Sequence, residues 1–344
     1  MRYGSQQSYD DEALGKFGLG LKTASLSQCR RLTVASRTHS SKGSIEIRQL
    51  DLDHVVDSNR WEIFDLSRCD RETRLVEPLK AASGTVVLWE SLDRVLGYKI
   101  PWGKRAETAL AAMADQLVMH LGMTFHRFVS GEISERGQVR MLVNGSRIKP
   151  WDPFATSEHA TVTLPGRDIA LETPDGAGLV RFQPYVLPTR EAFSSEQAFH
   201  LSAGPRRWNA QQGLYIYRSN RLIQSGGWSR MRTPDEHLKL ARASIDFFPD
   251  LDLAFEVNVA KARANLPAAL REKLREPIDE LVRAAQIAYR NENHLGQADR
   301  ESTERKYRSA LEDAARRAGA MRALRSIVRE LDRTRPEVAR RLGW

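Results

Sequence analysis

The first part of the chain combines a helical spacing of apolar residues with short runs typical of strands. Leu21, Ala24 and Leu26 recur at helical spacing, and the segments 32–35, 45–47 and 85–89 are rich in apolar and β-branched residues. Over residues 104–129 the apolar positions recur every three or four residues, which predicts an amphipathic helix with a buried stripe. These apolar positions are Leu110, Met113, Leu117, Leu121, Phe125 and Phe128. The pattern predicts an α/β layer over residues 1–130 that ends with this helix.

The middle of the chain follows a strand-and-turn pattern, and its last part follows a helical one. Asn144-Gly145 after the apolar residues 139–143 predicts a hairpin. Strands are expected at 179–182, 214–217 and 253–259, and a helix at 234–241. Beyond Pro267 the spacing predicts helix almost throughout, with a break near 291–293. We therefore expect a mixed α+β domain over 131–285 and a basic helical tail over 286–344.

Charge and composition narrow the class of protein. The 344 residues carry 53 Lys and Arg against 44 Asp and Glu, a net charge of +9. Residues 301–344 alone hold 12 basic and 7 acidic residues, so the tail could bind DNA phosphates. No stretch approaches the roughly eighteen apolar residues of a membrane span, and the two cysteines are too few for a disulfide framework. We expect a cytoplasmic protein with no membrane contact.

A glycine-rich segment from Gly15 to Thr23, with the sequence GKFGLGLKT, is the most informative motif. Its glycines allow backbone amides to approach an anion, and a helix follows directly. A P-loop does not fit, because Leu21 follows Gly20 and Lys22 comes one position late. A dinucleotide-binding fingerprint does not fit either, because Thr23 stands where Gly or Ala is needed.

This segment resembles the lid motif of the GHKL ATPases, the superfamily of gyrase, heat-shock chaperone, histidine-kinase and MutL ATP-binding domains. Every position from Gly15 to Ala24 agrees with that motif, and MORC-like bacterial members look closest. The resemblance implies that main-chain amides here wrap the triphosphate of ATP. It gives as ATP-binding candidates Gly15, Phe17, Gly18, Leu19, Gly20, Leu21, Lys22 and Thr23.

Three later segments extend the resemblance to about residues 12–285. Ser83-Gly84-Thr85 before a strand resembles the family's late Gly-Thr strand, which implies that Thr85 binds near the adenine. Residues 212–223, QGLYIYRSNRLI, look like the strand of the transducer domain in MutL-like and MORC-like proteins. Residues 255–267 resemble the family's strand-then-lysine loop, in which Lys261 holds the place of the catalytic lysine that contacts the γ-phosphate. Arg263 and Lys22 are reserve candidates for that role.

Other parts of the family pattern are missing. In relatives, a helix before the glycine loop carries the Glu that activates water and the Asn that binds Mg²⁺, and an Asp-x-Gly-x-Gly strand binds adenine. Only fourteen residues precede Gly15 here. We therefore expect that the chain as given does not hydrolyse ATP by itself and has no Mg²⁺ ligand of its own. Either Met1 is an internal methionine of a longer ATPase, or the chain is a degenerate remnant.

Taken together, the resemblance implies an α+β protein with a partial GHKL-type α/β sandwich, a transducer domain and a helical C-terminal arm. Its expected function is an ATP-driven clamp that forms a homodimer and acts with nucleic acid. The alternatives are a non-hydrolysing interaction module that binds DNA or a protein partner and, third, the ATP-binding domain of a sensor histidine kinase.

A second candidate nucleic-acid surface lies in the middle of the chain, where aromatic residues alternate with arginines. These residues are Trp208, Trp228 and Tyr217 among Arg206, Arg207, Arg218, Arg221 and Arg230. Such a mixture suits single-stranded nucleic acid, but it is more typical of a strand's core face and its solvated edge. The eight histidines, His120 and His126 among them, show no metal-site spacing and are expected in surface or core roles.

Overall fold

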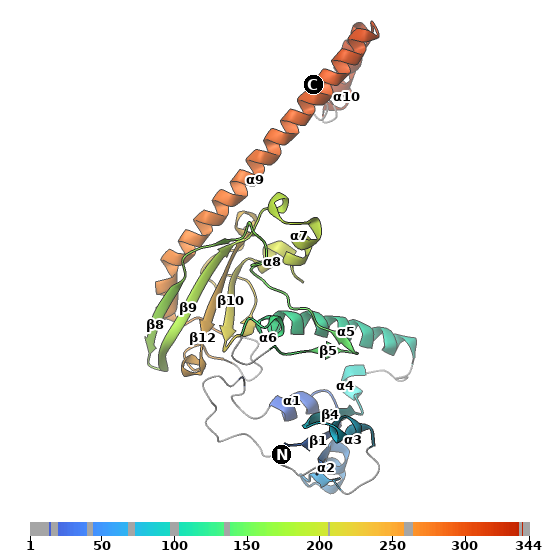
Figure 1. Cartoon of the computed structure of the whole chain (residues 1–344), viewed down its shortest axis with the longest axis vertical. Coiled ribbons are helices and arrows are strands. Elements are labelled where there is room, and N and C mark those ends of the chain that lie inside the picture. Colours follow the sequence, from blue (N-terminus) through green and yellow to red (C-terminus); the bar gives the residue numbers. More distant parts are fainter. Residues whose placement is uncertain are drawn as a thin grey trace.

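A computed structural model of the chain describes residues 14, 20–39, 44–67, 73–96, 103–133, 138–205, 207–257, 264–336 and 339. Side chains are described for these residues except 73–75, 94, 96 and 292–307. Helices and sheets both contribute to the fold, as the sequence predicts (Figure 1). None of the helices in the described ranges is long and apolar enough to span a membrane.

The N-terminal elements form a four-stranded antiparallel sheet with the strand order β3-β2-β1-β4. The strands are β1 (Arg31–Arg37), β2 (Glu46–Asp51), β3 (Phe64–Asp65) and β4 (Gly84–Glu90). The helices are α1 (Gly20–Leu26), α2 (Leu52–Ser58), α3 (Thr73–Lys80) and α4 (Asp93–Leu96). Because side chains alternate along a strand, one face of this sheet carries Ala35, Ile47 and Val86, which pack against Leu79 of α3. The predicted helix around Leu21 and the strands around 32–35, 45–47 and 85–89 are confirmed.

The long helix predicted over 104–129 is divided into α5 (Lys104–Thr124) and α6 (His126–Ser130). Its expected buried stripe is wrong over most of α5, because Leu110, Met113 and Leu117 are 41–44% exposed. The helix packs against α6, β5 and β11. At its C-terminal end burial is tight, since a Cβ on Gly122 would lie 2.7 Å from the carbonyl oxygen of Lys149. An apolar stripe therefore faces solvent along α5.

A six-stranded sheet forms the centre of the molecule, with the order β11-β10-β12-β9-β7 and with β8 paired to β9. The strands are β7 (Val162–Thr163), β8 (Arg167–Thr173), β9 (Gly176–Val186), β10 (Gly213–Arg218), β11 (Arg221–Gln224) and β12 (Ala241–Phe247). Only the β10–β12 pair is parallel in this sheet. Beside it, β5 (Leu142–Val143) and β6 (Ser146–Arg147) form the predicted hairpin, with positive φ at Asn144 and Gly145.

Helix α9 (Ala268–Arg317) covers this sheet and completes its core. It contacts β8, β9 and β12, and then continues beyond the sheet (Figure 1). Leu270, Leu274 and Ile278 recur every four residues on one side of α9 and are fully buried in the main core. The last helix, α10 (Met321–Thr334), follows a turn at Gly319, which has φ +66°, and packs against α9. The remaining short elements are α7 (Glu196–Ser202), α8 (Arg207–Gln211), η2 (Arg190–Ala192), η3 (Glu236–Leu238) and η4 (Pro249–Leu251).

Three expectations about this region are wrong. The predicted helix over 234–241 is only the short η3, and the strand β12 begins at Ala241. The predicted strand at 253–259 is a series of turns as far as Glu256, which has φ +48°, because Pro249 starts η4 and Phe255 N–H bonds back to the Leu251 carbonyl. The predicted break near 291–293 is absent, and α9 runs without interruption through it and through the expected domain boundary at 285/286.

Candidate functional site

The second half of the glycine-rich segment lies on α1, which packs against one face of the N-terminal sheet. Lys22 and Ser25 are the buried residues of this helix. The Ser25 hydroxyl accepts a hydrogen bond of 2.9 Å from the indole N–H of Trp89 on β4. This hydrogen bond fixes α1 to the C-terminal end of β4, where Trp89 lies.

Thr85, Val87 and Trp89 lie on the same face of β4, since side chains two residues apart on a strand point the same way. We call these three residues the open face of β4. Val87 is 42% and Trp89 41% exposed. Thr85 is also exposed, and its hydroxyl lies 3.1 Å from the Ser36 hydroxyl of β1. A surface about 13 Å long, by strand geometry, thus runs from α1 to the Thr85 hydroxyl.

Of the ATP-binding residues predicted from the sequence, those that the structure describes fall into two groups. Gly20, Leu21, Lys22 and Thr23 lie on α1, and Thr85 lies on β4. Gly15, Phe17, Gly18, Leu19, Lys261 and Arg263 lie outside the described residues. The contact between α1 and β4 brings the two described groups onto one side of the sheet. In the described ranges no cluster of three or more carboxylate, histidine or cysteine side chains forms a metal site.

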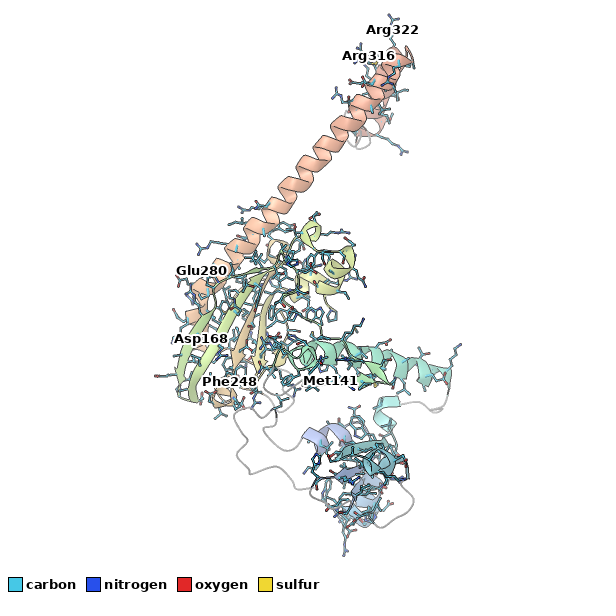
Figure 2. The ribbon with its side chains drawn as sticks, viewed as in Figure 1. Met141, Asp168, Phe248, Glu280, Arg316 and Arg322 are labelled. Carbon is cyan, nitrogen blue, oxygen red and sulfur yellow. The ribbon has the colours of Figure 1, made fainter. Side chains whose placement is uncertain are left out.

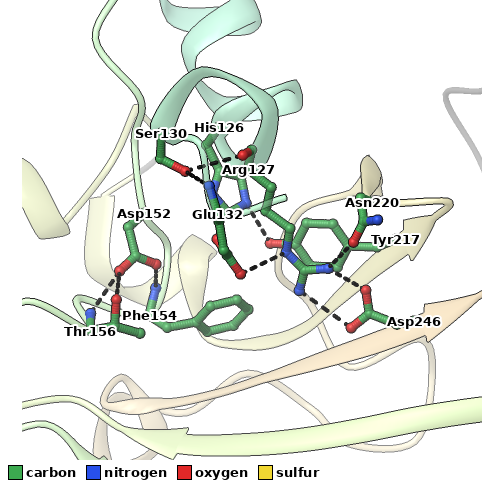
Figure 3. Close-up of polar contacts among 10 residues, drawn as sticks. All are labelled: His126, Arg127, Ser130, Glu132, Asp152, Phe154, Thr156, Tyr217, Asn220 and Asp246. Atoms are coloured by element: carbon green, nitrogen blue, oxygen red, sulfur yellow. Dashed lines mark hydrogen bonds and ion pairs between the residues drawn. The ribbon is translucent and has the colours of Figure 1, made fainter. Parts of the chain in front are cut away.

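A buried polar cluster joins α6 to the six-stranded sheet (Figure 3). His126 Nε2 lies 2.9 Å from the Tyr217 hydroxyl of β10, and both side chains are buried. Burial lowers the pKa of His126 to about 4, and the charge of the neighbouring Arg127 acts in the same direction. His126 is therefore neutral at physiological pH. Burial also raises the pKa of Tyr217 well above its usual value.

Arg127 provides the charged part of this cluster. Its guanidinium forms a two-nitrogen ion pair with Asp246 of β12, and its Cζ lies 3.7 Å from the centre of the Tyr217 ring. It also donates a 3.2 Å hydrogen bond to Asn220. Although burial acts against the charged form, the attraction of Asp246 raises the pKa of Arg127. We call His126, Arg127, Tyr217 and Asp246 the α6 joint.

Sequence reasoning did not find the α6 joint. The residue pairs His126–Tyr217 and Arg127–Asp246 are 91 and 119 positions apart in the chain. No local spacing connects them, and only the pairing of β10 with β12 places Tyr217 beside Asp246. The one available signal was a His-Arg pair at the end of an apolar helix.

The aromatic and basic residues of the middle segment are mainly core residues. Tyr217 and Trp228 are 0% and 2% exposed, so the interpretation as a core face is confirmed for both and a stacking surface is excluded there. Trp208 is partly buried and stacks on Phe199. Arg218 is buried and forms a bidentate ion pair with Asp252, with distances of 2.6 and 2.8 Å. Arg206 lies outside the described ranges.

Comparisons with known proteins agree with the assignment of the N-terminal part. Residues 1–85 match the family described as histidine kinase-, DNA gyrase B-, and HSP90-like ATPase. This match spans the glycine-rich segment and Thr85, and it supports a GHKL-type ATPase segment at this end of the sequence. No curated protein matches the chain.

Among solved structures, the chain is similar to the 43K ATPase domain of Thermus thermophilus gyrase B in complex with an aminocoumarin. The identity is 10% and the TM-score 0.25, with 81% of this chain and 72% of that chain covered. A TM-score this low does not establish a shared overall fold.

Proposed function

We propose that this chain is an ATP-binding protein of the GHKL type, in which nucleotide binding at α1 and β4 is transmitted to the six-stranded sheet. The observation that carries the proposal is the family match over residues 1–85, because it includes both the glycine-rich segment and Thr85. A MORC-like subtype is the finer assignment that we propose from the motif around Gly15 to Ala24.

The residues around the open face of β4 fit a nucleotide. Val87 and Trp89 offer apolar surface for a base, and the exposed Thr85 hydroxyl can bond to a ring nitrogen or amino group. At the other end, α1 carries the cation Lys22 and directly follows the glycines whose amides would bind phosphate. Bound ATP would supply a triphosphate whose last phosphate distinguishes it from ADP, and Lys261 would respond to that difference as a point charge. For Mg²⁺ the described residues offer no fitting ligand set, and we assign no step to it.

The six-stranded sheet and α9 are proposed to act as the transducer domain and the C-terminal arm, within domains at 1–130, 131–285 and 286–344. The α6 joint supports these roles, because its four polar side chains fix the C-terminal end of the proposed 1–130 domain to β10 and β12. Movement of α5 and α6 would therefore reach the central strands directly. A homodimer and DNA contacts through the basic tail are further parts of this proposal.

A thermal-unfolding experiment tests the proposal. The chain is heated with Mg-ATP, with Mg-ADP and without nucleotide, and Lys261→Ala and Thr85→Val are compared with the control Lys149→Ala, an exposed lysine far along the chain. Saturation at a hundred times Kd would stabilise the protein by about 2.7 kcal/mol. We expect a larger rise in the midpoint with ATP than with ADP, a smaller difference in Lys261→Ala, and weaker binding of both nucleotides in Thr85→Val. No shift with either nucleotide would refute ATP binding by this chain.

A second candidate is a non-hydrolysing interaction module. The exposed stripe of Leu110, Met113 and Leu117 on α5 favours it, because contiguous exposed apolar residues are typical of interaction surfaces. The thermal experiment separates the two candidates, since an interaction module needs no nucleotide. The family match over residues 1–85 does not distinguish the histidine-kinase alternative. We keep it third because a sensor kinase has no counterpart to the segment from Tyr215 to Ile223 or to Lys261.

A further inference from the structure

Two adjoining cavities form a groove along the first turns of α9. Their volumes are about 440 and 360 Å³, and both are lined by Arg230 and Arg271. Arg232 and Arg275 line the second cavity. We call these four residues the arginine groove. Arg230 and Arg232 come from the loop after β11, and Arg271 and Arg275 lie one turn apart on α9, so two separate elements bring four cations together.

Most of this positive charge is not neutralised within the described ranges. Asp279 forms an ion pair with Arg232, and Glu256 accepts a hydrogen bond from Asn265. In the same ranges, Arg230, Arg271 and Arg275 make no ion pair with a carboxylate. The neighbouring segment 258–263, NVAKAR, contains no acidic residue. Arg230 and Arg275 are exposed and Arg271 is partly buried. Three guanidinium groups without a carboxylate partner in one groove give it a positive field, which attracts an anionic partner.

Two local features strengthen this conclusion. The Nε–H of Arg271 is buried and has no hydrogen-bond partner among the described residues, although an unsatisfied buried donor costs about 1–3 kcal/mol. Arg271 and Arg275 also lie in the first two turns of α9, whose first turn contains no acidic residue. The N-terminus of a helix is the positive end of its dipole, so Arg271 in the first turn adds to a positive field that favours binding of an anion.

The backbone of the opposite wall is strained in the same place. Ser229 and Arg230 have φ values of +47° and +65°, and both lack the conformational freedom of glycine. A left-handed conformation at a non-glycine residue costs about 1 kcal/mol or more, and such strain is concentrated at functional sites. Here it directs the loop that carries Arg230 toward α9.

We infer that the arginine groove binds the sugar–phosphate backbone of a nucleic-acid duplex. Guanidinium groups bind phosphate oxygens in a bidentate manner, and their spread over two elements suits successive phosphates better than one. None of the described residues that line the two cavities is aromatic, so these residues offer no surface on which the bases of a single strand could stack. The contacts are therefore to phosphates and independent of base sequence. This inference does not depend on ATP binding.

Fluorescence anisotropy with the full chain tests the groove, using a labelled DNA duplex, the matching RNA duplex and the single DNA strand, all without nucleotide. The test variant is Arg230→Gln with Arg275→Gln, because both side chains are exposed and make no ion pair among the described residues. The control is Arg140→Gln with Arg147→Gln, two exposed arginines that make no ion pair among the described residues, one directly before Met141 (Figure 2) and one on β6. Circular dichroism melting confirms that each variant is folded.

We expect the groove variant to lose roughly tenfold or more in duplex affinity, and the slope of log K against log salt to fall by about 2 for two lost phosphate contacts. The control should keep most of both. Arg230→Lys with Arg275→Lys should keep the slope and establishes that charge is the cause if the glutamine variant melts early. Binding to either duplex supports the groove, and the stronger of the two identifies the natural partner. Unchanged duplex binding in the groove variant, loss of binding in the control variant alone, or tighter binding of the single strand would each overturn it.

Discussion

Replacing Asp246 by Asn removes the charge that balances Arg127 in the α6 joint, while it keeps the shape of the side chain. The two side chains are 11% and 17% exposed, so the pair is largely buried. Breaking a fully buried pair costs about 3–5 kcal/mol, because one charge is left without its partner. Some exposure remains here, Asn can still accept one hydrogen bond, and the Tyr217 ring still faces the guanidinium. We therefore expect a loss of about 2–3 kcal/mol in unfolding free energy.

Urea unfolding followed by circular dichroism measures this loss, and with the usual denaturant slopes it corresponds to a midpoint shift of about 1 M. The matched control is Arg181→Gln, which breaks the ion pair of Arg181 with Asp168 in the same sheet. That pair is 3.9 Å apart with side chains 62% and 64% exposed, and exposed pairs contribute about 1 kcal/mol or less. If Asp246→Asn costs no more than Arg181→Gln, the α6 joint does not hold α6 to the sheet as argued.

Three further predictions concern His126 in the α6 joint, Gly213 on β10 and Phe255 in the core of the six-stranded sheet. The pKa of His126 is about 4 in the folded chain and about 6.5 when unfolded, so the unfolded state binds more protons between these values. The unfolding free energy should therefore fall by up to about 3 kcal/mol as the pH drops from 6.5 to 4. His126→Gln should remove that part of the pH dependence in urea titrations. If the variant loses the same amount of stability in acid, the lowered pKa of His126 is not the cause. Gly213→Ala should destabilise the chain by about 2 kcal/mol or more in the same assay, because φ is +101° and the new Cβ would lie 2.4 Å from the Gly227 carbonyl oxygen. Gly145→Ala is its control, with φ +78° and no atom within 4 Å of the new Cβ, and should cost only about 1 kcal/mol. Phe255→Ala should cost about 3–5 kcal/mol, since its ring is 0% exposed and stacks on Phe247 at 3.9 Å; a loss below 1 kcal/mol would show that the turn after η4 tolerates the cavity.

The sequence predicted those elements whose side-chain pattern is local. The strands around Leu32, Thr85 and Leu214 and the Asn144-Gly145 hairpin all follow from the alternation of residues or from turn chemistry. The same kind of alternation predicts a strand over 253–259, but Pro249 and the stacking of Phe255 on Phe247 impose turns as far as Glu256. Tertiary packing overrides a local preference there.

Which side chains are buried was harder to predict than which segments are helical. The spacing of Leu110, Met113 and Leu117 correctly predicts α5, but periodicity does not reveal whether another element covers the stripe. The α6 joint and the arginine groove were beyond sequence reasoning for a similar reason. Their members are brought together by the order of strands and by the docking of α9, and both are set by contacts between residues far apart in the chain.

The uninterrupted course of α9 gives the molecule a mechanical lever. At 1.5 Å per residue its 50 residues extend about 75 Å. The part beyond Ala288, which is the last residue of α9 in the main core among those with described side chains, accounts for about 43 Å. A tilt of about 5° where the helix leaves the sheet would move its far end by about 4 Å, by the same geometry. If the helix were broken near residue 291, a tilt at the sheet would not be passed on to the part beyond the break. Continuity of the backbone hydrogen bonds therefore allows a rearrangement of a few degrees at the sheet to become a displacement of several ångströms at α10.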